Sequence, residues 1–99
     1  MAKRKVIWTK KANLERKEIL QYWITRNKSK TYSTKLNKLF IDSLAKVSES
    51  PTIGRPTEFD HVRVKIVRDY LLFYEYDETV LKVLTVWDGN REDKTLEIK

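Results

Sequence analysis

The sequence predicts an α+β fold of order β-α-α-β-β-β, with an N-terminal helical hairpin packed on one face of a small, mainly antiparallel, twisted sheet. Two observations support this fold class. Apolar residues recur at helical spacing in the first half of the chain and at a spacing of two in the second half. Both prolines fall in residues 51–61, between the two halves. A length of 99 residues fits one domain, which we assign to residues 1–99.

The chain is expected to begin with a short strand and a helix. Residues 6–9 read Val-Ile-Trp-Thr, and such a run of β-branched and aromatic residues favours extended structure. The period then changes, which predicts a helix near residues 12–27 with Asn13 as its N-cap. Leu20 and Trp23 lie on one side of this helix at helical spacing, so that side is expected to face the core.

A second helix is predicted from about Tyr32 to about Ser48. It must end before Pro51, whose ring removes a backbone donor and restricts the preceding residue. Four polar residues, 27–30, separate the two helices, so an antiparallel hairpin is expected. The apolar stripe of the second helix consists of Tyr32, Leu36, Leu39, Phe40, Ser43, Leu44 and Val47.

Three strands are predicted after the loop at residues 51–61. Val62, Val64 and Ile66 alternate with Arg63 and Lys65, so the two cations are expected on a face opposite the buried valines, either as a solvated face or as an active surface. The two later strands are expected at residues 70–76 and 80–87, joined by a polar hairpin turn at residues 77–79.

Composition excludes several classes of protein. There is no Cys, which excludes a disulfide framework, a cysteine nucleophile and a thiolate metal site. The single histidine, His61, cannot by itself form a histidine-rich zinc site, so neither a metal nor another cofactor is expected. No apolar run approaches the length of a membrane-spanning helix, and the N-terminus lacks the apolar stretch of a signal peptide. We therefore expect a cytoplasmic protein without a membrane partner.

The net charge of +7 is concentrated near the N-terminus. Residues 1–30 hold ten Lys and Arg against two acids, a net charge of +8, whereas residues 31–99 hold eleven against twelve, a net charge of −1. Such asymmetry favours an acidic partner, although cations can also serve only to keep a helix surface soluble.

Several short motifs occur in an order that is typical of one family. They are Glu49-Ser50-Pro51, Gly54-Arg55-Pro56, Val62-Arg63-Val64, Tyr70-Leu71-Leu72-Phe73-Tyr74 and Val83-Leu84-Thr85-Val86-Trp87-Asp88 ahead of Asn90-Arg91. Together with the helical hairpin they resemble the RelE/ParE superfamily of toxins from type II toxin–antitoxin modules, over nearly the whole chain. The resemblance implies a bacterial growth inhibitor of the plasmid-stabilisation type, neutralised by a cognate antitoxin and contacting operator DNA only through the complex with that antitoxin.

The superfamily contains two kinds of activity. The long hairpin, with residues 19–23 and 50–56, resembles the ParE-like branch, whose members poison DNA gyrase. The alternative is a RelE-like, metal-independent endoribonuclease that cuts messenger RNA on the ribosome. In that case the resemblance assigns Lys65 to a strand lysine and Arg91 to a later arginine, but Leu71 replaces one expected arginine and the C-terminal segment lacks the expected Tyr.

His61 is a third catalytic candidate, as a general base, because an imidazole exchanges protons near neutral pH. A second alternative function is an inactive relative that acts only as a binding module.

The expected antitoxin carries a disordered, acidic C-terminal segment, which should meet the N-terminal cations. Apolar anchors of that segment are expected in grooves beside two tryptophans, while an exposed sheet edge offers further backbone groups. The residues predicted to bind the antitoxin are Trp8, Lys10, Lys11, Arg16, Lys17 and Trp23.

Overall fold

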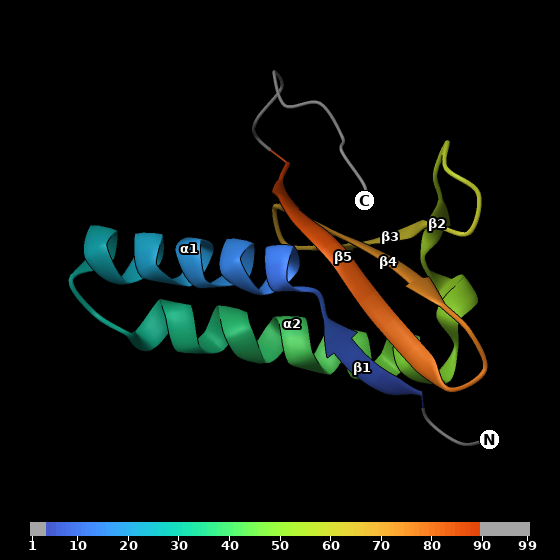
Figure 1. The fold of residues 1–99 in the computed structure, drawn as a ribbon. Helices are drawn as coiled ribbons and strands as arrows, with labels where there is room; N and C mark the ends of the chain where they lie inside the picture. Colours follow the sequence, from blue (N-terminus) through green and yellow to red (C-terminus); the bar gives the residue numbers. More distant parts are fainter. Residues whose placement is uncertain (1–3, 90–99) are drawn as a thin grey trace.

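The computed structural model describes residues 4–89, in which a helical hairpin covers one face of a five-stranded sheet (Figure 1). The predicted α+β class and element order are confirmed. The elements are β1 (Lys5–Trp8), α1 (Lys10–Asn27), α2 (Thr31–Glu49), the short 3₁₀ helix η1 (Pro51–Ile53), β2 (Arg55–Pro56), β3 (Arg63–Val67), β4 (Tyr70–Tyr76) and β5 (Val80–Asp88).

The sheet has the strand order β1-β5-β4-β3-β2 and is antiparallel except for one pair. The exception is β1, which runs parallel to β5 with Trp8 opposite Val83. The two-residue strand β2 was not predicted; it lies inside the expected loop and pairs Arg55 with Val64. The sheet therefore has β1 and β2 at its edges.

The predicted cap of the first helix is wrong. The helix begins at Lys10, and its N-cap is Thr9, whose side-chain oxygen accepts a hydrogen bond from the backbone N–H of Ala12 at 3.1 Å. The same hydroxyl donates to the carbonyl of Leu84 at 3.0 Å, so the cap also joins the helix to β5. Asn13 instead accepts a hydrogen bond from Arg16 inside the first turns of the helix.

The predicted apolar stripe of α2 faces the main core, the larger hydrophobic cluster between the helices and the sheet. Leu36, Phe40, Leu44 and Val47 are buried against the helix-facing side of the sheet, whereas Leu39 lies half-buried at its margin. The hydroxyl of Ser33 donates to the carbonyl of Leu20 at 3.0 Å and so ties α2 to α1. This packing fixes the position of α1, which carries most of the candidate site residues.

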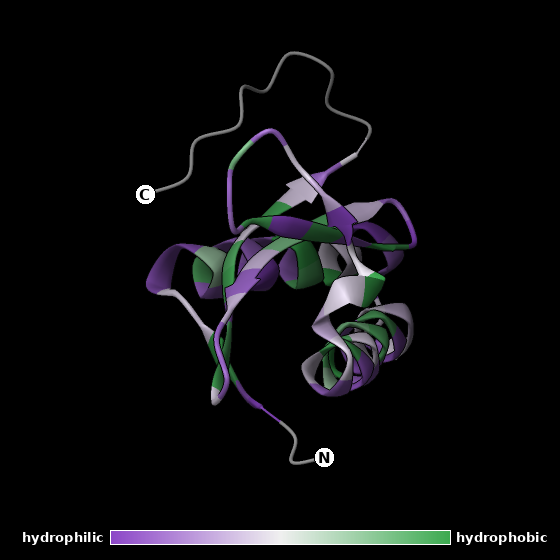
Figure 2. Ribbon diagram, turned by 90° about the vertical axis from the view of Figure 1, so that its right-hand side faces the viewer, coloured by the Kyte–Doolittle hydropathy of each residue, from purple (hydrophilic) through white to green (hydrophobic). Residues whose placement is uncertain are grey.

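A smaller apolar cluster occupies the sheet face without helices. Its buried members are Val62, Phe73 and Leu84, and the Phe73 ring meets the Trp87 ring edge-on with centroids 5.3 Å apart. Hydrophobic and hydrophilic segments alternate along the strands in Figure 2, as expected when neighbouring side chains point to opposite faces.

A β-bulge on β5 connects the sheet to α1. Val83 pairs with Tyr74 and Thr85 pairs with Phe73, so Leu84 is an extra residue without a register partner. The carboxylate of Glu15 on α1 accepts hydrogen bonds from the Thr85 hydroxyl at 2.6 Å and from the backbone N–H of Val86 at 3.1 Å. A charged group of the helix thus satisfies donors at the irregular part of the strand.

The carboxylate of Asp77 stabilises the turn between β4 and β5, so the stability of the protein should depend on pH. Its Oδ1 accepts hydrogen bonds from the backbone N–H groups of Thr79 and Val80, both at 2.8 Å. These two bonds are the main reason why the pKa of Asp77 lies below its ordinary value. Because the folded state favours the ionised form, the stabilisation should be present above about pH 4, the pKa of an unfolded Asp, and be lost as the pH falls through the lower folded pKa.

Urea unfolding at several pH values tests this expectation. The Asp77→Asn variant should be less stable than the unmutated protein at pH 7, and the difference should shrink as the pH is lowered through the carboxyl range. Glu78→Gln in the same turn is the matched control, because it removes a neighbouring negative charge. A constant difference between Asp77→Asn and the unmutated protein from pH 7 to about pH 2 would contradict the assigned role.

Candidate functional site

The first part of α1 and the end of β1 bring Trp8 and Arg16 together. The guanidinium carbon of Arg16 lies 4.1 Å from the centroid of the Trp8 ring, within the range of a cation–π contact. Arg16 also donates to the Asn13 side-chain oxygen at 2.6 Å, which fixes its position. Partial burial lowers the pKa of Arg16 from its ordinary value, yet an arginine remains cationic at neutral pH. The Arg16 guanidinium is thus held over the Trp8 ring, and the pair presents a positive charge beside an aromatic surface.

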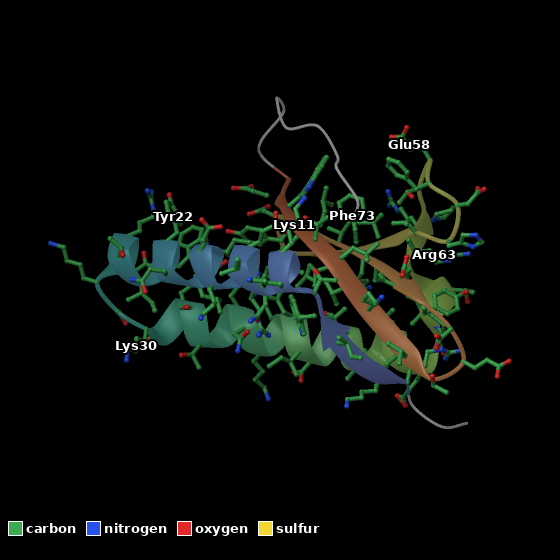
Figure 3. The ribbon with its side chains drawn as sticks, in the orientation of Figure 1. Lys11, Tyr22, Lys30, Glu58, Arg63 and Phe73 are labelled. Carbon is green, nitrogen blue, oxygen red and sulfur yellow. The ribbon has the colours of Figure 1, made fainter. Side chains whose placement is uncertain are left out.

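Lys10, Lys11 and Lys17 are exposed on the same helix, and the first turn of α1 contains no acid. The N-terminal end of a helix already carries a partial positive charge, and acidic residues placed there stabilise a helix. Lys10 and Lys11 instead add to the positive charge at this end. Lys11 lies where α1 begins beside β5 (Figure 3). We call the surface formed by Trp8, Lys10, Lys11, Arg16 and Lys17 the basic surface.

Trp23 lies apart from the basic surface, two helical turns beyond Arg16. Its indole N–H donates to the hydroxyl of Tyr70 at 2.8 Å, and its ring meets Tyr22 and Tyr32 edge-on, with centroids 5.1 and 4.8 Å apart. The two predicted tryptophans therefore belong to different environments. The Trp8 ring packs against the guanidinium of Arg16, whereas Trp23 joins α1 to β4 through its hydrogen bond to Tyr70.

A hollow of about 540 Å³ opens beside Trp23, between α1 and the ends of β4 and β5. We call it the α1–β4 hollow. The residues that line it include four acids, Glu15, Glu18, Asp69 and Asp88. Sequence analysis did not find this group, because its members come from three separate places in the chain. The one available signal is that Glu15 and Glu18 are the only acids among the first 30 residues.

The catalytic candidates do not share a site within residues 4–89. His61 lies in the loop before β3 and lines a second hollow, of about 310 Å³, with Glu75 and Lys82 among its walls. Lys65 lies on β3 opposite Leu72 and lines neither hollow. Three residues separate the two in sequence, and the chain turns at His61, whose φ is 70°. Arg91 lies outside the described residues.

As expected, Arg63 and Lys65 lie on the sheet face opposite Val62 and Val64, and that face is the one toward the helices. Val67 belongs to the main core under the helices, so Lys65 and Arg63 lie on that side, and Ile66, which is 46% exposed, lies on the helix-free side. Arg63 donates to the carbonyl of Gly54 at 2.6 Å. It anchors the connection between α2 and β3, a structural task that the alternation pattern alone did not indicate.

Two absences apply to the part of the chain that the structure describes. No three His, Cys, Asp or Glu residues between 4 and 89 gather in a way that could hold a metal ion. Over the same residues, neither helix is both long and apolar enough to cross a membrane.

The described part of the chain is therefore a small α+β protein with a helical hairpin on a mixed sheet and a basic first helix. The family profile described as "ParE toxin of type II toxin-antitoxin system, parDE" matches residues 6–93, so the chain belongs to the ParE toxin family. The resemblance noted in the sequence is thereby confirmed.

The fold is also similar to that of a solved chain from the chromosomal ParDE toxin–antitoxin system of P. aeruginosa. The TM-score is 0.72 over 84% of this chain and 92% of that chain, and the sequences are 15% identical. At that identity the likeness concerns the fold alone. No curated protein sequence matches the chain significantly.

Proposed function

We propose that this ParE-family toxin inhibits bacterial growth by acting on DNA gyrase, and that an acidic segment of a cognate antitoxin neutralises it at the basic surface. Family membership supports the toxin assignment, and the ParE-like character of the sequence favours gyrase. One structural observation carries the choice of target. Cleavage of RNA needs a base, an acid and fixed cations around one phosphate, and the hollow that His61 lines does not include Lys65.

The basic surface fits an acidic, partly disordered segment better than the α1–β4 hollow does. Lys10, Lys11 and Lys17 project exposed cations, and the Trp8–Arg16 pair offers a flat ring beside a fixed guanidinium for an apolar anchor. The hollow beside Trp23 is lined by four acidic residues and would repel such a segment. The proposal therefore places the acidic residues of the antitoxin at the Trp8 end of α1.

Reversing three charges of the basic surface should slow association with the antitoxin. The Lys10→Glu, Lys11→Glu, Lys17→Glu variant is expected to lower the association rate about tenfold at low salt and to flatten its salt dependence, because long-range steering is lost. Dissociation should change less, since buried anchors control it. Stopped-flow or surface-binding kinetics at several salt concentrations measure both rates.

A matched control changes the same charge on the other helix. Lys35, Lys38 and Lys46 on α2 are also exposed, so reversing all three to Glu alters the net charge equally. That variant should keep most of the association rate. An association rate of the unmutated protein that is equal at low and high salt would exclude steering, because salt screens it.

The target is tested by expressing the toxin without its antitoxin. We expect double-strand breaks, the SOS response and filamentous cells, with intact messenger RNA, and the purified protein should inhibit supercoiling by gyrase. The Lys65→Ala, Arg91→Ala double variant should remain fully toxic. Cut messages that disappear in this variant would replace gyrase with the ribosome as target, and an absence of any growth defect would leave the binding module.

A further inference from the structure

The α1–β4 hollow has a composition that the basic surface and the proposed target do not explain. It lies on a protein with a net charge of +7, yet four acidic residues and one arginine, Arg26, line it. Tyr22, which is exposed on the outer side of α1 (Figure 3), forms its rim, and the Trp23 and Tyr70 side chains form part of its wall. The hollow therefore combines negative charge with aromatic surface.

Backbone contacts bring two of the acidic residues, Asp69 and Asp88, close together. Tyr70 pairs in register with Asp88, and the N–H of Gly89 donates to the carbonyl of Asp69 at 2.7 Å. A Cβ atom on Gly89 would lie 2.8 Å from that carbonyl, closer than real Cβ atoms come, so glycine is needed where the β3–β4 turn meets the end of β5. Asp69 and Asp88 are thus brought together by the fold itself.

Two of the acids that line the hollow have no ion pair among the described residues. Neither Glu18 nor Asp69 forms an ion pair within residues 4–89. Arg26 lies with its Nη1 3.5 Å from the hydroxyl of Tyr22, and no ion pair joins it to a carboxylate in that part of the chain. A cation bound beside Glu18 and Asp69 would be attracted by both charges.

A buried hydroxyl provides a second, independent indication of a ligand. The side chain of Tyr70 is 5% exposed, and its oxygen accepts the indole N–H of Trp23, but its own O–H has no acceptor among the described residues. Burial raises the pKa of Tyr70 and the charges of Asp88 and Asp69 raise it further, so the hydroxyl keeps its proton at neutral pH. It can donate to a carbonyl oxygen of a ligand in the hollow.

The size and spacing of the hollow favour an organic cation over a metal ion. Its carboxylates do not form a group of three that could hold a metal. A volume of about 540 Å³ lies within the usual range of sites for small molecules or anchoring side chains. Aromatic walls next to carboxylates suit a guanidinium or ammonium group, which gains from both ring faces and negative charge.

We infer that the α1–β4 hollow is the binding site for a basic side chain, arginine or lysine, presented by a partner polypeptide. The carboxylates of Glu18 and Asp69 receive the cation, and the Tyr70 hydroxyl donates to a backbone carbonyl of the same segment. The site lies apart from the basic surface and has the opposite charge, so one toxin can engage an acidic segment at Trp8 and a basic segment at Trp23.

A short peptide with an isosteric neutral control tests the inference. The probe is acetyl-Leu-Arg-Leu-amide, and its control replaces arginine by citrulline, which has the same shape without the charge. Titration of the ¹⁵N-labelled full chain should give saturable shifts of the Trp23 indole N–H, with a dissociation constant on the order of millimolar. Citrulline should bind at least about fivefold more weakly.

Paired variants assign the binding to the hollow. Glu18→Gln with Asp69→Asn should abolish the saturable shift without lowering the melting temperature, because both changes remove unbalanced like charges. Glu49→Gln with Glu58→Gln removes two exposed acids elsewhere and should leave binding intact. Equal binding of arginine and citrulline, unchanged binding by the first variant, or no shift up to about 10 mM peptide would overturn the inference.

Discussion

Replacing Leu44 by Ala is expected to lower the free energy of unfolding by about 2–5 kcal/mol. The Leu44 side chain is 1% exposed and belongs to the main core between α2 and the sheet. Its truncation removes apolar contacts and leaves a cavity that the surrounding strands cannot fill without moving. Urea unfolding followed by tryptophan fluorescence measures the loss.

The same helix offers a matched control. Ile41 is 50% exposed, so Ile41→Ala should change the free energy of unfolding by less than about 1 kcal/mol. Leu39, which is half-buried, should give an intermediate loss when it is replaced by Ala. Equal losses at Leu44 and Ile41 would mean that α2 presents a different face to the sheet.

Replacing Gly54 by Ala should also destabilise the protein strongly, by more than about 2 kcal/mol. A Cβ atom at this position would lie 2.2 Å from the hydroxyl oxygen of Tyr74 and 2.9 Å from two of its ring carbons. Tyr74 is fully buried and cannot move aside, since its hydroxyl donates to the carbonyl of Pro51 and accepts the N–H of Gly54 at 3.1 Å.

A double-mutant cycle isolates this contact. Tyr74→Phe removes the oxygen that the new Cβ would meet, at a cost of about 1–3 kcal/mol for the unsatisfied backbone groups of Pro51 and Gly54. The Gly54→Ala, Tyr74→Phe double variant should therefore lose less stability than the two single losses added together. Strict additivity in chemical denaturation would show that the strain at Gly54 has another source.

The sequence was informative wherever a periodic signal was continuous. The apolar periodicity and the β-branched runs correctly predicted both long helices and four of the five described strands, β1, β3, β4 and β5. It was silent where structure depends on distant partners. Thr9 caps α1 and also donates a hydrogen bond to the carbonyl of Leu84, which is far away in sequence. The strand β2 forms because Arg55 pairs with Val64. The β-bulge at Leu84 has no signal in the local sequence, and neither do the hydrogen bonds that Thr85 and Val86 donate to Glu15.

The same distinction applies to the candidate site. The cations of the basic surface lie close together in sequence, so their concentration before residue 31 was visible at once. The acids of the α1–β4 hollow come from residues 15, 18, 69 and 88, and only the fold assembles them. His61 and Lys65 show the reverse case, since neighbours in sequence do not form one site.

The pairing of the first strand with the last has a consequence for the order of folding during synthesis. β1 leaves the ribosome before the other described elements, yet its backbone partners lie on β5, about 75 residues later, as in the pair of Val6 with Leu81. Such distant contacts form late, because closing a long loop must precede any gain from the contact. Trp8 and the first turn of α1 therefore reach their final positions only after β5 has been translated. A partner that binds the basic surface would meet molecules in which β5 is already made and paired, rather than shorter nascent chains.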